Sequence, residues 1–172
     1  SIFKQQKLTS LIAPDLEVID ALNPIIAKVE KEIQHNAVYH NPQHVLLLQT
    51  MPGIGDILSL VILYETHDIK RFVKHQHYSS YSRVVRAVQT SKSKIVGMKH
   101  CKMGNPYLKW AFSSIIISAQ QSSERIRKYY QKLESKYGKA NARARIAHKF
   151  NVAVYYMLKN NQPFDEKRFI VN

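Results

Sequence analysis

The chain contains 172 residues, of which 45% are hydrophobic, and carries a formal net charge of +14. This length and apolar content exclude a disordered tail and allow one large domain, or one domain with an arm. Five glycines and six prolines are too few for a loop-rich all-β protein, and the single cysteine, Cys101, excludes an internal disulfide. Without a signal peptide or a long apolar run, we expect a soluble cytoplasmic protein that does not enter a membrane.

The charge is divided unevenly along the chain. Residues 1–69 contain four Lys and Arg against eight Asp and Glu, a net charge of −4. Residues 70–172 contain 22 basic and four acidic residues, a net charge of +18. A basic half of this size indicates a polyanionic partner, and it favours nucleic acid over an acidic protein or a membrane surface.

Residues 1–40 are predicted to form a helical arm. Five apolar residues recur at the three-and-four spacing of a coiled-coil seam, namely Ile19, Leu22, Ile26, Val29 and Ile33. Pro14 and Pro24 interrupt the arm, so we expect two helices, near 14–22 and 24–37, or one helix kinked at Pro24. The seam is expected to serve assembly, by self-association or by docking an upstream domain, and packing on the chain's own core is the alternative.

Residues 41–162 are predicted to form the main helical domain, beginning with a helix, a PGIG turn and a second helix. This pattern is that of a helix-hairpin-helix, in which Gly53 and Gly55 let the backbone approach a neighbour closely. The free N–H groups at the start of the second helix could hold a nucleic-acid phosphate. Alternatively, the turn merely joins two core helices, because no lysine or arginine lies between Val45 and Ile69.

In the next segment the net charge of the chain changes from negative to positive, and several histidines occur. Residues 68–72 are predicted to form a short helical turn and residues 75–82 a polar helix, while residues 83–88 fit either a strand or a helix end. His75 and His77 stand two positions apart, on opposite sides of a helix, without a nearby acidic or cysteine partner. We therefore predict no metal site in this chain.

The stretch from Thr90 to Phe112 contains serines among lysines and ends on a helix start. Asn105 is a good N-cap and Pro106 suits the first helical position. Hydroxyls, lysines and a helix N-terminus together suit a phosphodiester. The candidate nucleic-acid contacts of this stretch are Lys92, Lys94, Lys99, Lys102, Asn105 and Lys109.

The remaining sequence is helical in pattern, so the fold is predicted to be all-α or nearly so. We expect the whole fold to contain five to seven helices and at most a short hairpin between Val84 and Cys101. Trp110 is predicted to lie in the core rather than to stack on a base. Another helix, which ends near Gly138, carries Arg125, Arg127, Lys128 and Lys132, which are predicted to follow a phosphate backbone while Tyr129 or Tyr130 stacks on a base. The last helix covers about 140–160, and residues 163–172 are expected to be a loose tail.

Four motifs in order carry a resemblance to a known family: LLLQTMPGIGDILSLVI, then RF, then YSRVVRAVQTSKSK, then KMGNPYLKWAF. Together they resemble the C-terminal transposase domain of the insertion-sequence "one-ten" family, which includes pilin-gene invertases and bridge-RNA-guided recombinases. The resemblance implies a DNA transposase or site-specific recombinase with a preceding coiled-coil arm and RNase-H-like domain. It also implies DNA as a partner and a homo-oligomer as the working assembly, and the guided members of the family make a guide RNA a further candidate partner.

The same resemblance implies the catalytic residue. The family's S-x-G-K motif falls on residues 91–94, which makes Ser91 the expected nucleophile and Ser93, in place of the usual glycine, its rival. The serine would attack a DNA phosphodiester and form a phosphoserine link, while neighbouring lysines neutralise the developing charge. No cofactor is expected within this chain, because Mg²⁺ would sit on the carboxylates of the RNase-H-like domain, and this fragment alone is expected to be inactive. The alternative is a non-catalytic nucleic-acid-binding module on the same helices.

Overall fold

The computed structural model describes residues 2–85, 87–91, 94–99 and 103–171, and only the backbone of residues 2–10, 37–40, 87–91, 94–99 and 171. Contacts divide the chain into two compact units, residues 1–40 and residues 41–172, and each is considered by itself.

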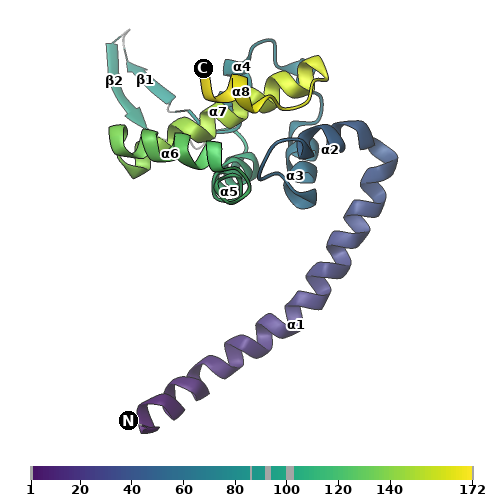
Figure 1. The fold of residues 1–172 in the computed structure, drawn as a ribbon, viewed down its shortest axis with the longest axis vertical. Coiled ribbons are helices and arrows are strands. Elements are labelled where there is room, and N and C mark those ends of the chain that lie inside the picture. The colour runs from purple at the N-terminus through teal and green to yellow at the C-terminus, as the bar shows by residue number, and fades with distance from the viewer. Residues whose placement is uncertain (1, 86, 92–93, 100–102, 172) are drawn as a thin grey trace. The chain divides into compact units, whose positions relative to one another are not determined.

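The first unit is a single helix, α1 (Ile2–His40), which contains both Pro14 and Pro24 (Figure 1). Of the two arrangements expected, two helices or one, the structure has one continuous helix. Each proline removes one backbone hydrogen bond and crowds one carbonyl. The remaining hydrogen bonds of the 39-residue helix are enough to keep the helix continuous at both positions.

The coiled-coil seam of α1 is exposed. Its five side chains, from Ile19 to Ile33, keep between 41% and 51% of their surface accessible. Within this unit they form no core of their own. The assembly role of the seam stays a prediction.

The second unit is helical apart from one hairpin, which confirms the predicted fold class. Its elements are α2 (Pro42–Gln49), α3 (Asp56–Thr66), the 3₁₀ turn η1 (Ile69–Arg71), α4 (His75–Tyr81), β1 (Ala87–Ser91), β2 (Lys94–Lys99), α5 (Pro106–Ser122), α6 (Glu124–Tyr137), α7 (Lys139–Asn160) and α8 (Glu166–Val171). The described residues thus contain eight α-helices, one more than the upper limit predicted. The hairpin lies within the interval where the sequence allowed one.

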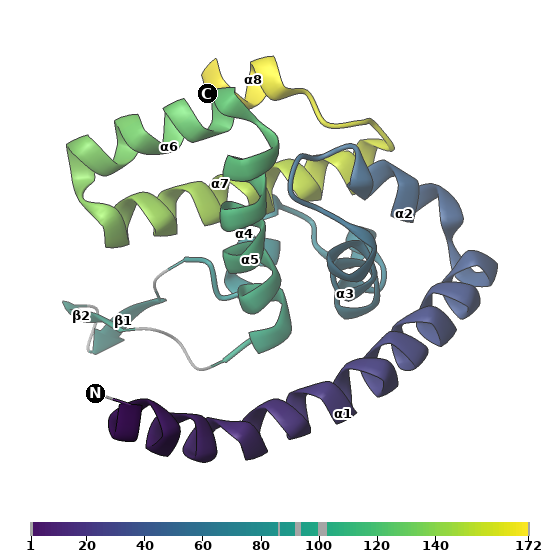
Figure 2. The same ribbon diagram turned by 60° about the horizontal axis from the view of Figure 1, so that its bottom comes forward.

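Helix α5 lies at the centre of this unit. Figure 2 shows it between α3 and the antiparallel pair α6 and α7, and it packs against all three. Its inner face is the predicted apolar stripe, and residues such as Leu108, Phe112 and Ile115 are fully buried. Burial of each such large apolar side chain contributes about 1.5–3 kcal/mol, so this stripe is a substantial part of the core that α5 shares with its neighbours.

Trp110 is not part of this core, which corrects the prediction. Trp110 is 53% exposed, and its neighbours on the same side of the helix, Tyr107 and Ile117, are 63% and 52% exposed. Successive helical residues are about 100° apart, so a stripe through Leu108, Phe112 and Ile115 turns positions 107, 110 and 117 outward. The outer face of α5 therefore presents an apolar, partly aromatic surface.

The end of the chain is ordered by packing, which corrects the expectation of a loose tail. Phe169 of α8 is 5% exposed and stacks on Phe150 of α7, with ring centroids 4.7 Å apart. Ser123, which caps α6 through the N–H of Ile126, also donates a hydrogen bond to Glu166 of α8. Helix α8 is consequently fixed beside α6 by an aromatic contact and a polar one.

Candidate active site at the serine hairpin

The hairpin places Ser91 at the end of β1 and Lys94 at the start of β2. The two residues are paired across the antiparallel ladder, where they close the strands. The pairing shifts by one residue between Gln89 and Thr90, so β2 carries an extra residue at this bulge. Ser93 and Lys92 lie in the connection between the strands, outside the described residues, and so does Lys102 beyond β2. For Ser91, Lys94 and Lys99 the structure describes the backbone alone.

The chain enters the hairpin from the C-terminal turn of α4. Ser82 donates its backbone N–H to the carbonyl of Tyr78 at 2.8 Å, and Val84 donates to that of Ser79 at 3.2 Å. Between them, Arg83 has a positive φ of 55°, which is uncommon for a residue with a side chain. These contacts turn the chain sharply away from α4 just before β1.

The chain returns from the hairpin to the same turn of α4. The backbone N–H of Asn105 donates to the carbonyl of Tyr81 at 2.6 Å. Gly104, with φ +102°, comes so close that a Cβ atom there would lie 2.5 Å from that carbonyl oxygen. Only glycine fits this approach, because the backbone conformation and the contact both exclude a side chain. We call this convergence of the Arg83 and Gly104 segments on α4 the hairpin root.

Asn105 fixes the hairpin root to two helices. Its Oδ1 accepts hydrogen bonds from the N–H groups of Tyr107 and Leu108 at 2.8 and 3.0 Å, which caps α5. Its Nδ2 donates to the carboxylate of Glu65 on α3. With this residue 8% exposed and both ends of its amide engaged, we correct its assignment from a nucleic-acid contact to a structural cap.

The same cap changes the view of the helix N-terminus. The first N–H groups of α5 are already bonded to Asn105, and Pro106 has none to offer. The start of α5 therefore has little capacity left for the phosphate that the sequence pattern suggested.

Tyr81 and Arg71 complete the root. The Arg71 guanidinium carbon lies 4.6 Å from the ring centroid of Tyr81 and, on η1, also covers Phe72 at the same distance. The hydrogen bond with Asn105, followed by that with Arg71, lowers the pKa of the Tyr81 hydroxyl. The root thus joins η1, α3, α4 and α5 through one polar cluster.

Helix α4, on which the root depends, is held by buried polar bonds. Asn151 of α7 accepts from Ser79 Oγ at 2.7 Å and donates to Ser82 Oγ at 3.0 Å, and all three residues are buried. Tyr78 shares a 2.9 Å bond with Thr66 of α3, and burial raises the pKa of its hydroxyl. Each buried bond is costly to break, because it would leave a polar group unsatisfied.

The PGIG turn joins two core helices, and Gly53 lies against another part of the protein. A Cβ atom at Gly53 would lie 2.5 Å from the backbone nitrogen of Ala119 on α5, so the close approach is to protein. Gly55 is open, with nothing within 4 Å of its would-be Cβ, and it precedes Asp56 at the start of α3. Asp56 accepts a hydrogen bond from Gln49 at 2.8 Å, and its carboxylate disfavours a phosphate at this helix end.

The basic candidates on α5 and α6 are all exposed. Arg125 is 63% exposed and lies 3.6 Å from Glu166 of α8, while Lys128 is 71% exposed and lies 3.0 Å from Glu124. Lys109 and Arg127 are exposed without a recorded ion pair among the described residues. These cations are available to a polyanion, since exposed ion pairs are weak and readily exchanged.

Sequence reasoning missed three members of the root: Gly104, Glu65 and Arg71. Gly104 and Arg71 stood within the recognised motifs, but their partners are distant in sequence and no local pattern indicates them. The signal that could have found Gly104 is the glycine itself, because glycine is the default residue where the chain needs a positive φ or a close backbone approach.

The described residues contain neither a metal-binding cluster nor a membrane-spanning helix. Among the residues that the structure describes, no group of three or more His, Cys, Asp or Glu side chains could hold a metal ion. In the same part of the chain, no helix is both long enough and apolar enough to span a membrane.

One comparison with known proteins identifies a family, and no curated protein matches the chain. The family model described as Transposase IS116/IS110/IS902 family matches residues 45–131. The matched segment, half of the chain, runs from α2 into α6 and contains the whole hairpin and its root. It also contains PGIG and the GNPYLKWAF motif. The chain therefore belongs to the IS116/IS110/IS902 transposase family.

Proposed function

We propose that this chain supplies the nucleophilic serine of a DNA transposase or site-specific recombinase. The observation that carries the proposal is the position of Ser91, at the end of a cationic hairpin whose two ends are fixed to one turn of α4. A nucleophile must be held in a defined place to attack in line. Membership of a transposase family implies that the chain acts on DNA. The attack by serine is our proposal.

The proposed step is a transesterification at phosphorus. The Ser91 hydroxyl gives up its proton as its oxygen forms a bond to a DNA phosphorus. The bond from that phosphorus to one DNA oxygen breaks, and the departing DNA oxygen takes up a proton, so that a phosphoserine and a DNA hydroxyl result. The reverse attack by another DNA hydroxyl regenerates the serine and joins the new strand. Lys94, the ladder partner of Ser91, belongs to a cationic loop that would neutralise charge on the phosphorane.

Serine is a weak nucleophile and needs a base or a metal to activate it. The described residues do not fit Mg²⁺, because they contain no cluster of ligating side chains, so we derive no step through it here. The carboxylate at the root, Glu65, is engaged with Asn105. We propose that Mg²⁺ is held by a separate acidic domain, that the working enzyme is a homo-oligomer, and that a guide RNA is a possible further partner.

The test compares serine variants in a recombinase that contains this chain together with that acidic domain. Ser91→Ala is expected to abolish strand exchange and any covalent protein–DNA species, while DNA affinity stays within about twofold. Ser93→Ala is expected to have a mild effect, and Ser93→Gly should retain or raise activity.

A covalent species that persists in Ser91→Ala and disappears in Ser93→Ala would transfer the role to Ser93. If neither change affects strand exchange, the proposed chemistry is wrong and the chain is a non-catalytic binding module.

A further inference from the structure

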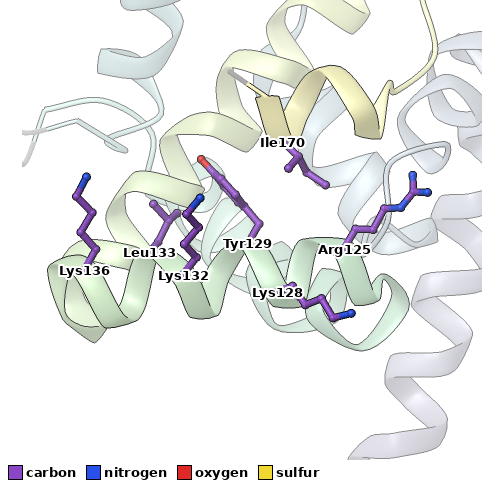
Figure 3. A pocket seen from close by; sticks show the side chains of 7 residues that line it. All are labelled: Arg125, Lys128, Tyr129, Lys132, Leu133, Lys136 and Ile170. Carbon is purple, nitrogen blue, oxygen red and sulfur yellow. The ribbon is translucent and has the colours of Figure 1, made fainter.

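A groove of about 510 Å³ runs between α6 and α8, apart from the serine hairpin. It is lined by six residues of α6 and one of α8, namely Arg125, Lys128, Tyr129, Lys132, Leu133, Lys136 and Ile170 (Figure 3). The family match ends at residue 131, so much of this groove lies outside the matched segment. Its lining combines apolar and cationic side chains, so a ligand that fits it should carry both an apolar surface and negative charge.

The apolar side of the groove is formed by Tyr129, Leu133 and Ile170. Tyr129 is held in place: its hydroxyl accepts a 2.9 Å hydrogen bond from Lys149 of α7. The Lys149 ammonium also lies 4.5 Å from the ring centroid, and Phe169 meets the ring edge-on at 6.2 Å. A supported ring that lines an open groove is suited to stack on a planar ligand group.

The cationic side of the groove follows one row of α6. Lys128, Lys132 and Lys136 recur every four residues, which corresponds to a spacing of about 6 Å along the helix. Lys128 pairs with Glu124 and Arg125 with Glu166, whereas the described ion pairs include no carboxylate for Lys132 or Lys136. The row therefore keeps an excess of positive charge beside the apolar surface.

We infer that this groove binds a single-stranded segment of nucleic acid, with one base stacked on Tyr129 and the neighbouring phosphates on the lysine row. Single-strand binding sites join a positive groove to aromatic platforms in this way. A duplex would offer its phosphates, but its paired bases could not reach Leu133 or Ile170. The inference rests on the proposed function only in taking nucleic acid as the ligand.

A strand-exchange reaction gives such a site a purpose. Strands must leave one duplex before they join another, so unpaired segments arise next to the reacting phosphates. A groove that holds unpaired bases would stabilise this open state. The chemistry of the groove thus selects unpaired nucleic acid without selecting a nucleotide sequence.

The test measures binding of the 172-residue chain to labelled oligonucleotides of equal length by fluorescence anisotropy. The probes are oligo-dT, an abasic strand with the same phosphates, and a mixed-sequence duplex. Tyr129→Leu should weaken oligo-dT binding roughly 5- to 100-fold and leave the abasic strand and the duplex almost unchanged. Tyr129→Phe keeps the ring and should retain most of the affinity.

A second pair of variants tests the cationic row. Lys132→Gln with Lys136→Gln should reduce the salt slope of single-strand binding by about 1.4, because each phosphate contact on a single strand contributes about 0.7. Lys167→Gln, an exposed lysine on α8 outside the groove lining, should leave single-strand binding nearly unchanged. Circular dichroism melting of each variant checks that α8 stays docked.

The inference is overturned if a well-folded Tyr129→Leu variant binds all three probes as the parent does, or loses affinity for all three alike. It is also overturned if an acidic peptide binds the chain with the same dependence on Tyr129, because the groove would then be a protein site. Loss of catalysis in Ser91→Ala with intact single-strand binding would concern the proposed function alone, so the two failures are distinguishable.

Discussion

The hairpin root and the α6–α8 groove are both associated with positive charge, but they are built in opposite ways. At the root, Gly104 and Asn105 are held by backbone contacts and a buried cap, with almost no room for a different side chain. On α6, Arg125 and Lys128 are well exposed, and each makes one ion pair, Arg125 with the partly buried Glu166 and Lys128 with the exposed Glu124. The same unit thus contains a tightly packed backbone at the root and solvent-exposed cations on α6.

The difference corresponds to two kinds of work. A nucleophile must be positioned within a fraction of an ångström, which needs rigid support from packed elements. Cations that attract a phosphate backbone act at longer range and tolerate movement. Changes at the root should therefore affect stability and chemistry, and changes on α6 should affect affinity.

The largest expected effect comes from Gly104→Ala. The added Cβ would meet the carbonyl of Tyr81 at 2.5 Å in a backbone with φ +102°, so we expect a loss of about 2–4 kcal/mol in the free energy of unfolding. Gly138→Ala is the matched control, because Gly138 also has positive φ but its Cβ would meet nothing within 4 Å. Its loss should be smaller than that of Gly104→Ala, at about 1–3 kcal/mol, because φ 75° with ψ 159° strains a residue with a side chain but no clash is added. Equal losses in urea denaturation would remove the claim of a tight root.

Asn105 provides a sharper test of the same cluster. Asn105→Ala removes the α5 cap and should cost about 1–2 kcal/mol. Asn105→Asp keeps the cap acceptor but places a second carboxylate against Glu65, so it should also destabilise the chain. Adding Glu65→Gln should then restore stability, since the glutamine can donate to the new aspartate. If the double variant is no more stable than Asn105→Asp, the Glu65 contact is not part of the root.

The α6 cations should change affinity with little change in stability. Neutralisation by Arg125→Gln, Arg127→Gln and Lys128→Gln should reduce the salt slope of duplex DNA binding by about three, across all sequences. Neutral residues are preferable to glutamate here, because reversal would repel Glu166 and Glu124 and disturb the docking of α8. The control pair Lys28→Gln and Lys31→Gln, in the acidic half of the chain, should leave the slope nearly unchanged. An unaltered slope in the α6 variant would contradict the assignment.

The smallest effect is expected from acidification. Burial, and then the charge of His75 on α4, lower the pKa of His148 on α7. The unfolded chain therefore binds a proton first, and stability should fall as the pH drops below about 6.5, the ordinary histidine value. Because α4 carries the hairpin root, the root should loosen in acid. His148→Gln should flatten the change in urea midpoint between pH 7.5 and 5.5, and an unchanged slope would exclude His148 as its source.

Much of the fold could be predicted because its boundaries have local chemical causes. Asn41-Pro42 and Asn105-Pro106 start helices as expected, and Gly138 ends one. These signals act within four residues, so a sequence displays them directly.

The errors have an equally physical origin. The sequence predicts Trp110 in the core, but Leu108, Phe112 and Ile115 occupy the inner face of α5 and leave Trp110 on its outer face. Helix α8 is too short for a periodic pattern and is fixed by Phe169 against Phe150, far away in the sequence. The contact of Gly104 with Tyr81 likewise joins separate segments, and no local pattern encodes it. The role of Ser91 stays a prediction.

The most direct test of the central proposal is to locate the covalent bond between protein and DNA. A recombinase containing this chain would be trapped on a suicide DNA substrate, digested with trypsin and nuclease, and examined by mass spectrometry. We expect a nucleotide phosphate attached to Ser91, and no modified peptide in the Ser91→Ala variant. A phosphate found on Ser93, or a trapped complex without a serine-linked nucleotide, would contradict the proposal.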